Sequence, residues 1–329
     1  MINLFIAISM RFSKNDGIKK GENRVFQFSH KNSEDLFKET QIEFIRKSKY
    51  QIVNPKNFTV IDCYFDLFEK IREKYSESNI FESLKQADNY YKLLNLISES
   101  GGRSSSFIFI TSDNRLVLKT ITKCEFNFFS KFLLLNYTNR IQTCAESRLV
   151  RIFALLLIPY LDQYVIIMEN VVQNKEECLI FDLKGSKVAR LVDGVSDPKN
   201  PPKNKVMKDV NFDLFGYKIQ ASPSFKEQLI QACNKDFLLL KNSGVMDYSI
   251  LLCIQENLSE NPQLNKFSFL DLNGLIITIA IIDILQDYCL CKICEKAAKS
   301  ILNDPEKVSS TDPESYCIRI SNYLGTIIH

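Results

Sequence analysis

Two aspartates within strongly apolar stretches are the first candidates for chemistry in this chain. Asp247 lies in Met-Asp-Tyr-Ser-Ile-Leu-Leu, residues 246–252, and Asp283 lies in Ile-Ala-Ile-Ile-Asp-Ile-Leu-Gln, residues 279–286. A carboxylate that is buried without a partner costs free energy, so an aspartate in such a stretch usually holds a metal, a proton or an arginine. The two residues together indicate a site.

Phosphoryl transfer is one reaction that needs two carboxylates with different tasks. One carboxylate orients or deprotonates the attacking hydroxyl, and the other holds magnesium on the nucleotide phosphates. Two aspartates that only cap turns or helices are the alternative, which the pattern alone leaves open.

The segment before Asp247 has the signals of a long helix. Residues 222–224 open the predicted helix, its apolar stripe runs from Phe225 to Leu240, and residues 242–244 close it. We expect the strand that carries Asp247 to begin directly afterwards.

A turn signal precedes Asp283. The dipeptide Asn273-Gly274 separates two apolar runs and predicts a hairpin with a two-residue turn. Such a hairpin would carry Asp283 back toward Asp247.

The first half of the chain contains a glycine- and serine-rich segment, residues 98–106, before another hairpin. Residues 107–111 and 115–119 alternate as paired strands do, and Lys119 ends the second strand. A helix that carries Glu125 is expected next. This order of glycine-rich segment, strand lysine and helix glutamate is typical of a kinase-like nucleotide lobe.

Further elements follow from apolar spacing. They are a helix with apolar positions Tyr64, Phe68, Ile71 and Tyr75, a helix over 123–136, and strands at 164–168 and 179–181.

Composition limits the class of protein. The 329 residues are 45% apolar, enough for one large core or two smaller lobes. The net charge of +3 gives no argument for a nucleic-acid partner, and we expect none. Ten cysteines are scattered along the chain, which favours reduced thiols and a cytoplasmic protein. The apolar stretch 1–10 is too short to span a bilayer.

Six strings support a family resemblance. They are Gly-Gly-Arg-Ser-Ser-Ser-Phe (101–107), Leu-Val-Leu-Lys-Thr (116–120), Phe-Asp-Leu-Lys-Gly-Ser (181–186), Lys-Asp-Val-Asn-Phe (208–212), Met-Asp-Tyr-Ser-Ile-Leu-Leu (246–252) and Ile-Ile-Asp-Ile-Leu-Gln (281–286). In this order they resemble the catalytic domain of phosphatidylinositol phosphate kinases, from about residue 60 to the C-terminus.

The resemblance implies an α+β, two-lobed, kinase-like fold with antiparallel sheets and flanking helices. Residues 1–55 are then an N-terminal extension of unknown role, and 56–172 form the nucleotide-binding lobe. Residues 173–329 form the second lobe, which includes a specificity loop at 287–310.

The resemblance also assigns residues to ATP. It places Lys119 at the nucleotide phosphates, Glu125 in an ion pair with that lysine, and Met168 where adenine lies. The expected phosphate loop consists of Gly101, Gly102, Ser104, Ser105 and Ser106. Ser105 replaces the glycine that usually ends this loop, which leaves open a loop that approaches the phosphates less closely.

The catalytic roles implied by the resemblance fall on three residues. Asp247 is the catalytic carboxylate, Asp283 is the Mg²⁺ ligand, and Lys184 stands close to the transferred phosphate. Arg190 is a candidate for the headgroup phosphate of the lipid, with a surface salt bridge as the alternative. Asp182 is expected to be structural.

Substrate choice is expected in the specificity loop. Glu295 falls where phosphatidylinositol 4-phosphate 5-kinases resemble one another in carrying glutamate, and Lys292 retains part of the basic pair expected there. This favours phosphatidylinositol 4-phosphate as the substrate. The stretch Lys187-Val188-Ala189-Arg190 is instead closer to the 4-kinase pattern, so phosphatidylinositol 5-phosphate 4-kinase is the alternative.

Local charge indicates a membrane partner. Residues 184–208 contain seven basic side chains against two aspartates, and each basic residue near an anionic leaflet contributes about 1 kcal/mol to binding. We therefore expect peripheral binding to anionic membranes that contain a phosphoinositide, and a homodimer is possible. A catalytically weak phosphoinositide-binding scaffold and a soluble inositol phosphate kinase are the remaining alternatives.

Overall fold

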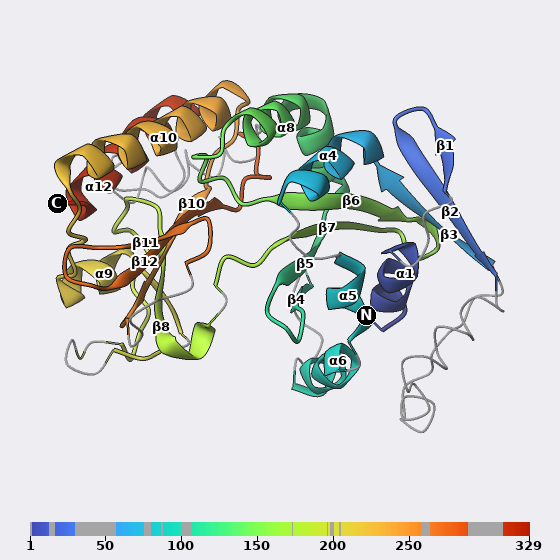
Figure 1. Ribbon diagram of the computed structural model, residues 1–329, viewed down its shortest axis with the longest axis horizontal. Coiled ribbons are helices and arrows are strands. Elements are labelled where there is room, and N and C mark those ends of the chain that lie inside the picture. Colours follow the sequence, from blue (N-terminus) through green and yellow to red (C-terminus); the bar gives the residue numbers. More distant parts are fainter. Residues whose placement is uncertain are drawn as a thin grey trace. The chain divides into compact units, whose positions relative to one another are not determined.

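The computed structural model has an α+β fold with two compact units (Figure 1). The first unit comprises Met1–Phe126 and Arg151–Asn170, and the second comprises Asn127–Val150 and Val171–His329. Each unit contains one β-sheet. The structure describes residues 2–12, 17–29, 57–75, 80–86, 88–99, 107–172, 174–195, 197, 201–203, 205–257, 264–288 and 312–329.

The sheet of the first unit has seven strands, and every neighbouring pair is antiparallel. In spatial order the strands are β1 (Ile18–Lys20), β2 (Asn23–Ser29), β3 (Asn57–Cys63), β6 (Ile152–Ile158), β7 (Gln163–Glu169), β5 (Leu116–Ile121) and β4 (Ile108–Ile110). The predicted hairpin before and through Lys119 is confirmed as β4 and β5.

Helices cover this sheet on two sides (Figure 1). α4 (Phe65–Tyr75) packs against β6, and its buried stripe of Phe68, Ile71 and Tyr75 confirms the helix predicted from that spacing. On the other side, α1 (Ile2–Phe12) packs against α5 (Ile80–Lys85) and α6 (Asp88–Glu99). α1, β1 and β2 therefore make the described part of residues 1–55 integral to this unit.

The sheet of the second unit has five strands. In spatial order they are β11 (Ser268–Leu270), β12 (Ile276–Ile282), β10 (Ser249–Gln255), β8 (Cys178–Leu183) and β9 (Val206–Lys208). The pairs are antiparallel except β8 with β9, which is parallel. Most consecutive residues of β10 and β12 are buried, so both faces of these central strands are covered.

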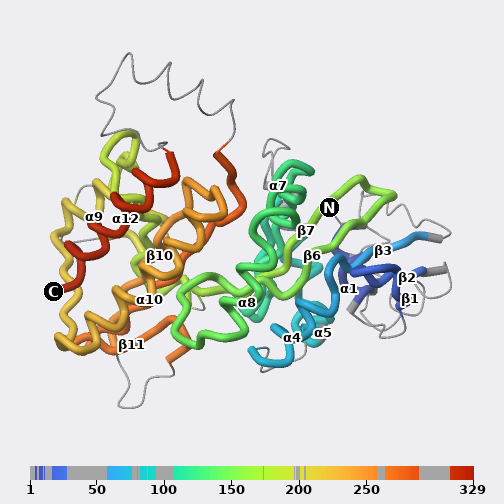
Figure 2. The backbone as a smooth tube through the Cα atoms, turned by 90° about the horizontal axis from the view of Figure 1, so that it is seen from above, coloured from blue at the N-terminus to red at the C-terminus, as the bar shows by residue number. Residues whose placement is uncertain are grey.

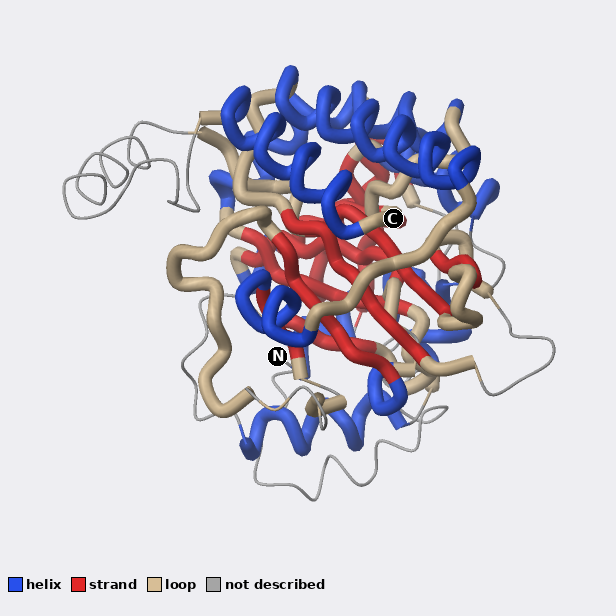
Figure 3. Tube along the Cα trace, turned by 90° about the vertical axis from the view of Figure 1, so that its left-hand side faces the viewer, coloured by secondary structure: helices blue, strands red, loops and turns tan. Residues whose placement is uncertain are grey.

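Two long helices pack together in the second unit (Figures 1 and 2). They are α10 (Pro223–Asn242) and α12 (Pro313–Ile327). In Figure 3, where the C-terminus is toward the viewer, helices lie across one face of the strands. The predicted helix before Asp247 is confirmed as α10, whose cap is Ser222, since the Ser222 hydroxyl accepts a hydrogen bond from the Phe225 amide at 3.4 Å.

The helix predicted over 123–136 is divided. The chain forms α7 (Lys123–Phe128), a π-helix η1 (Phe129–Leu133) and α8 (Leu134–Thr143). Within the described ranges, the remaining helices are α9 (Asp209–Phe215) and the 3₁₀-helices η2 (Pro159–Leu161) and η3 (Lys175–Glu177).

The hairpin predicted at Asn273-Gly274 is confirmed, but its predicted two-residue turn is wrong. Leu270 pairs with Ile276, so five residues connect β11 to β12. The Asp271 carboxylate accepts the amides of Asn273 at 2.9 Å and Leu275 at 2.8 Å, which stabilises the longer turn.

Candidate active site

Asp247 and Asp283 lie at the same end of two neighbouring strands. Asp247 comes just before β10 and Asp283 just after β12, and the antiparallel register pairs Ser249 with Ile282. The pairing continues past the strands, where the Met246 amide donates to the Gln286 carbonyl at 3.0 Å. The hairpin thus returns Asp283 toward Asp247 as expected, although both residues lie outside the strands rather than within them.

Both aspartates adopt a left-handed backbone conformation. Their φ angles are +61° for Asp247 and +59° for Asp283. This conformation costs an L-residue on the order of 1 kcal/mol, and strained residues of this kind cluster at functional sites. The Asp247 side chain is 22% exposed and Asp283 is exposed. Both carboxylates are therefore at least partly exposed, whereas their apolar sequence neighbours had suggested that they are buried.

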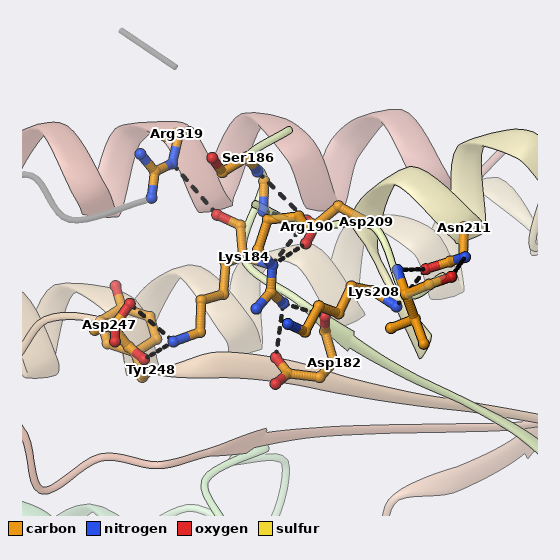
Figure 4. A network of polar contacts seen from close by, with 12 residues as sticks. Asp182, Lys184, Ser186, Arg190, Lys208, Asp209, Asn211, Asp247, Tyr248 and Arg319 are labelled. Atoms are coloured by element: carbon orange, nitrogen blue, oxygen red, sulfur yellow. Dashed lines mark hydrogen bonds and ion pairs between the residues drawn. The ribbon is translucent and has the colours of Figure 1, made fainter. Parts of the chain in front are cut away.

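Lys184 forms an ion pair with Asp247 (Figure 4). Its Nζ lies 2.8 Å from Asp247 Oδ1 and donates to the Asp247 backbone carbonyl at 2.7 Å. Lys184 directly follows β8, whose Leu183 pairs with Ile250 of β10, so the two neighbouring strands bring the lysine to the aspartate. The lysine side chain is only 13% exposed. This site holds a cation beside a partly accessible carboxylate.

Asp209 fixes the backbone that carries Lys184, and sequence reasoning assigned it no role. Its Oδ1 accepts the amides of Lys184 at 2.9 Å and Gly185 at 2.7 Å, with a longer contact of 3.4 Å from Ser186. Asp209 is 1% exposed. Since three successive N–H groups converge on one carboxylate, the loop after β8 is fixed in a single conformation.

Arg190 is also internal to this network. It is 7% exposed, donates through Nε to Asp209 Oδ2 at 2.7 Å and pairs with Asp182 Oδ1 at 3.0 Å. Burial alone would lower the pKa of Arg190, but its bonds to Asp209 and Asp182 outweigh burial and raise it. The alternative of a surface salt bridge is wrong, because the Arg190 guanidinium is buried between Asp182 and Asp209. The assignment of Arg190 to the headgroup phosphate stays a prediction.

Asn211 holds the far end of the same loop. Its Oδ1 accepts the Val192 amide at 2.9 Å, and its Nδ2 donates to the carbonyls of Val192 and Val195, both at 3.1 Å. Asp209 and Asn211 are the two polar residues of Lys-Asp-Val-Asn-Phe. That string was a signal for them, because a buried polar residue in an apolar motif usually binds backbone groups.

The first unit contains the described residues expected to bind nucleotide. Lys119 is half-buried in β5, where it pairs with Ile108 and Ile166. Met168 lies on β7. Just beyond β7, the Asn170 side chain donates to the Asn114 carbonyl at 2.8 Å, which ties the end of the strand to the β4–β5 turn.

Glu125 has a different local role from the expected ion pair with Lys119. Its Oε2 accepts the Thr122 amide at 2.7 Å and the Thr122 hydroxyl at 2.8 Å, while its own amide donates to that hydroxyl at 3.1 Å. This reciprocal arrangement is a capping box. The carboxylate therefore stabilises the start of α7.

Several expected site residues lie outside the described residues. They are Gly101, Gly102, Ser104, Ser105 and Ser106 of the phosphate loop, and Lys292 and Glu295 of the specificity loop.

An α+β protein with a lysine–aspartate pair and a second aspartate at adjoining strand ends has the features of a phosphotransferase with a kinase-like fold. The family model described as Phosphatidylinositol-4-phosphate 5-Kinase matches residues 89–273 and 266–327. The chain belongs to this family of lipid kinases.

Individual relatives include kinases whose names state different substrates. Phosphatidylinositol 4-phosphate 5-kinase 5 from Arabidopsis thaliana is 25% identical, over 68% of this chain and 37% of the relative. Phosphatidylinositol 4-phosphate 5-kinase from Plasmodium falciparum is 31% identical, over 50% and 10%. Phosphatidylinositol 5-phosphate 4-kinase type-2 alpha from Sus scrofa is 26% identical, over 71% and 70%. The matched region spans 37% of the length of the Arabidopsis relative.

Within the described residues, every helix is too short or too polar to cross a bilayer. The seven cysteines of the described ranges carry free thiols.

Proposed function

We propose that this protein is an ATP-dependent kinase that phosphorylates the 5-hydroxyl of phosphatidylinositol 4-phosphate to give phosphatidylinositol 4,5-bisphosphate. The observation that carries the proposal is the Lys184–Asp247 pair, 2.8 Å apart, next to the strand end that bears Asp283. Family membership supports ATP as the phosphate donor and a phosphoinositide as the acceptor.

The Lys184–Asp247 pair can perform the two local tasks of this transfer. The Asp247 carboxylate accepts a hydrogen bond from the inositol hydroxyl and orients its oxygen for in-line attack on the γ-phosphate. The Lys184 ammonium offsets the negative charge that develops on the phosphoryl oxygens. Because the backbone of Lys184 is fixed through Asp209, little reorganisation is needed when that charge appears.

Asp283 fits a magnesium ion by its donor chemistry. Mg²⁺ prefers oxygen ligands and is commonly bound by one or two carboxylates together with substrate phosphates. Asp283 offers an exposed carboxylate beside the strand end of Asp247. When bound, the ion would neutralise phosphate charge.

In the first unit, we assign Lys119 to the nucleotide phosphates and Met168 to the adenine surface. The half-buried position of Lys119 in the middle of β5, paired on both sides, supports a fixed cation there. Gly101, Gly102 and Ser104–Ser106 remain the proposed phosphate loop.

The position of the new phosphate rests on Glu295, with Lys292 as a headgroup contact. The alternative is transfer to the 4-hydroxyl of phosphatidylinositol 5-phosphate. The names of relatives include both activities, so the decisive measurement is the position of the new phosphate on the lipid product.

Peripheral binding to an anionic membrane is also proposed, with a smaller basic surface than the sequence suggested. Lys184 and Arg190 are occupied by internal aspartates. Lys203 and Lys205 are exposed and remain available to anionic lipid. A homodimer and a cytoplasmic location remain proposals of the same kind.

The proposal is tested with radiolabelled ATP, Mg²⁺ and vesicles that contain one phosphoinositide at a time. We expect labelled phosphatidylinositol bisphosphate from phosphatidylinositol 4-phosphate, with the new phosphate on the 5-position, and loss of product in Asp283→Asn. Product only from phosphatidylinositol 5-phosphate would establish the 4-kinase alternative. Vesicle binding without product from any lipid would instead support the scaffold, which the serine at position 105 permits.

A Glu295→Ala variant tests the specificity assignment by itself. We expect its rate ratio between phosphatidylinositol 4-phosphate and phosphatidylinositol 5-phosphate to shift toward the second lipid. An unchanged ratio would show that Glu295 does not determine substrate choice, and would leave the kinase proposal intact.

A further inference from the structure

The C-terminal helix α12 turns one face toward the backbone of both loops that form the Lys184–Asp247 pair. Tyr316, Ile320 and Leu324 are fully buried along this face. Residues spaced by three or four positions share one side of a helix, so Tyr316, Arg319 and Tyr323 lie on the same side. Ile320 and Leu324 pack in the core, whereas Tyr316 and Arg319 make directed polar contacts.

Tyr316 holds the loop of Asp247. Its hydroxyl donates to the backbone carbonyl of Tyr248, the residue directly after Asp247. The Tyr316 and Tyr248 rings meet edge to face with centroids 4.8 Å apart, and Tyr248 stacks on Phe237 of α10 at 5.7 Å. Tyr248 is therefore fixed by one backbone contact and by rings from two helices.

The hydroxyl of Tyr316 is protonated at neutral pH and can donate a hydrogen bond. Burial raises the pKa of Tyr316 well above its ordinary value, and the nearby charge of Asp247 raises it further.

Arg319 holds the loop of Lys184 (Figure 4). Its Nε donates to the Lys184 backbone carbonyl at 3.3 Å, and its guanidinium lies 4.8 Å from the Tyr316 ring centroid. The next residue, Gly185, lies directly against α12. A Cβ at Gly185 would stand 3.0 Å from the Tyr323 Cβ and 3.4 Å from the Arg319 carbonyl.

We infer that α12 is the positioning element of the proposed active site, with Tyr316 and Arg319 as its positioning residues. The two side chains are in contact with each other, and each binds the backbone beside one member of the ion pair. The relative placement of Lys184 Nζ and the Asp247 carboxylate thus depends on α12. The expected effect on kcat rests on the proposed kinase function. The structural role of α12 in holding the two loops does not.

The first test compares two tyrosines of α12. Tyr316→Phe removes a hydroxyl bonded to the Tyr248 carbonyl, whereas Tyr323→Phe removes a buried hydroxyl that has no hydrogen-bond partner in the described part of the chain. For Tyr316→Phe we expect kcat to fall about tenfold, the factor that corresponds to one ordinary hydrogen bond, with the KM for ATP unchanged. Tyr323→Phe should match the wild type.

Arg319 provides an independent test. Arg319→Gln should lower kcat by about the same factor, and Arg319→Lys should restore part of the loss because an ammonium can still donate to the Lys184 carbonyl. Equal kcat values for wild type, Tyr316→Phe and Arg319→Gln, all shown to be folded by thermal unfolding, would overturn the inference.

Amide hydrogen exchange of the full chain separates this inference from the kinase proposal. In Tyr316→Phe we expect faster exchange in peptides that cover 246–251, and in Arg319→Gln faster exchange in peptides that cover 183–187. Exchange should stay at the wild-type rate in Tyr323→Phe. If the wild type phosphorylates no lipid, the proposed function fails while these exchange rates still decide the role of α12. Unchanged exchange in both variants would refute that role.

Discussion

The two units each contain an ion pair near the end of a strand, but the two pairs have different surroundings. Arg11 and Asp62 of the first unit are 4% and 0% exposed, and Arg11 stacks over the Phe26 ring at 3.8 Å. Lys184 and Asp247 of the second unit are 13% and 22% exposed. The second pair is partly exposed to solvent, whereas side chains enclose the first.

The difference lies in what supports each pair. Burial raises the pKa of Asp62, and the adjacent Arg11 charge opposes that rise, so this pair is strongly desolvated. Such a pair stabilises the fold mainly because breaking it leaves a buried charge. The Lys184–Asp247 pair is instead held through its backbone by Asp209 and α12. Its side chains are therefore fixed in place while their charged ends stay accessible.

The largest effect should come from breaking the accessible pair. We expect Lys184→Met and Asp247→Asn each to lower kcat by about 10³-fold, the scale of losing a charge-stabilising group in an active site. The control is Lys19→Met, which removes the exposed ion pair with Asp66 in the first unit. Steady-state kinetics with lipid vesicles gives the comparison. An equal loss of activity in Lys19→Met would contradict the prediction.

The enclosed pair should control stability and not chemistry. Arg11→Met leaves Asp62 buried without its cation, so we expect the free energy of unfolding to fall by about 3–5 kcal/mol. The control is Lys19→Met, which removes the exposed pair with Asp66 and should change that free energy by less than about 1 kcal/mol. Denaturant unfolding measures both. A lower kcat per folded molecule in Arg11→Met would show that the enclosed pair also affects catalysis, which would contradict the prediction.

An intermediate effect is expected at Asp209, which fixes the backbone of Lys184. Asp209→Asn keeps the side-chain shape but removes the charge that binds Arg190 and the three loop amides. We expect kcat to fall about tenfold, with a loss of stability as well. Kinetics and thermal unfolding of the same preparation separate the two effects. A loss of stability alone would reduce Asp209 to a purely structural residue.

The smallest kinetic effect should come from Asp236 on α10. Its buried carboxylate binds the Arg148 amide at 2.6 Å and Arg140 Nε at 2.7 Å, and the Arg148 carbonyl accepts the Ile281 amide of β12 at 2.7 Å. This chain of contacts ends two residues before Asp283. We expect Asp236→Asn to raise the Mg²⁺ concentration for half-maximal rate by about threefold, since outer contacts orient metal ligands. A Mg²⁺ titration with an unchanged midpoint would exclude the connection.

The sequence predicted the elements whose side chains follow one clear period. α4 and α10 each bury one apolar stripe, and β4 with β5 alternates around a polar turn. β6 was missed because Ile152–Ile158 is buried on both faces apart from one residue, so no alternation marks it. β2 and β3 were missed because they lie on either side of a long segment of mixed polarity.

The site was predicted in part for a related reason. Distinctive strings contain Asp247, Asp283 and Lys184. The hairpin before Asp283 predicted that the two strand ends lie close together. Asp209 acts on amides more than twenty residues earlier, a contact that only the parallel β8–β9 pairing creates. The exposure of Arg190 was misjudged because charge alone does not tell whether a side chain points inward.

One product analysis tests the proposed active centre most directly. Vesicles that contain phosphatidylinositol 4-phosphate are incubated with labelled ATP, Mg²⁺ and either wild-type protein or Asp247→Asn, and the lipid product is identified by headgroup position. We expect phosphatidylinositol 4,5-bisphosphate from the wild type and about 10³-fold less from the variant. Equal product from the two proteins would contradict the assignment of the Lys184–Asp247 pair as the active centre.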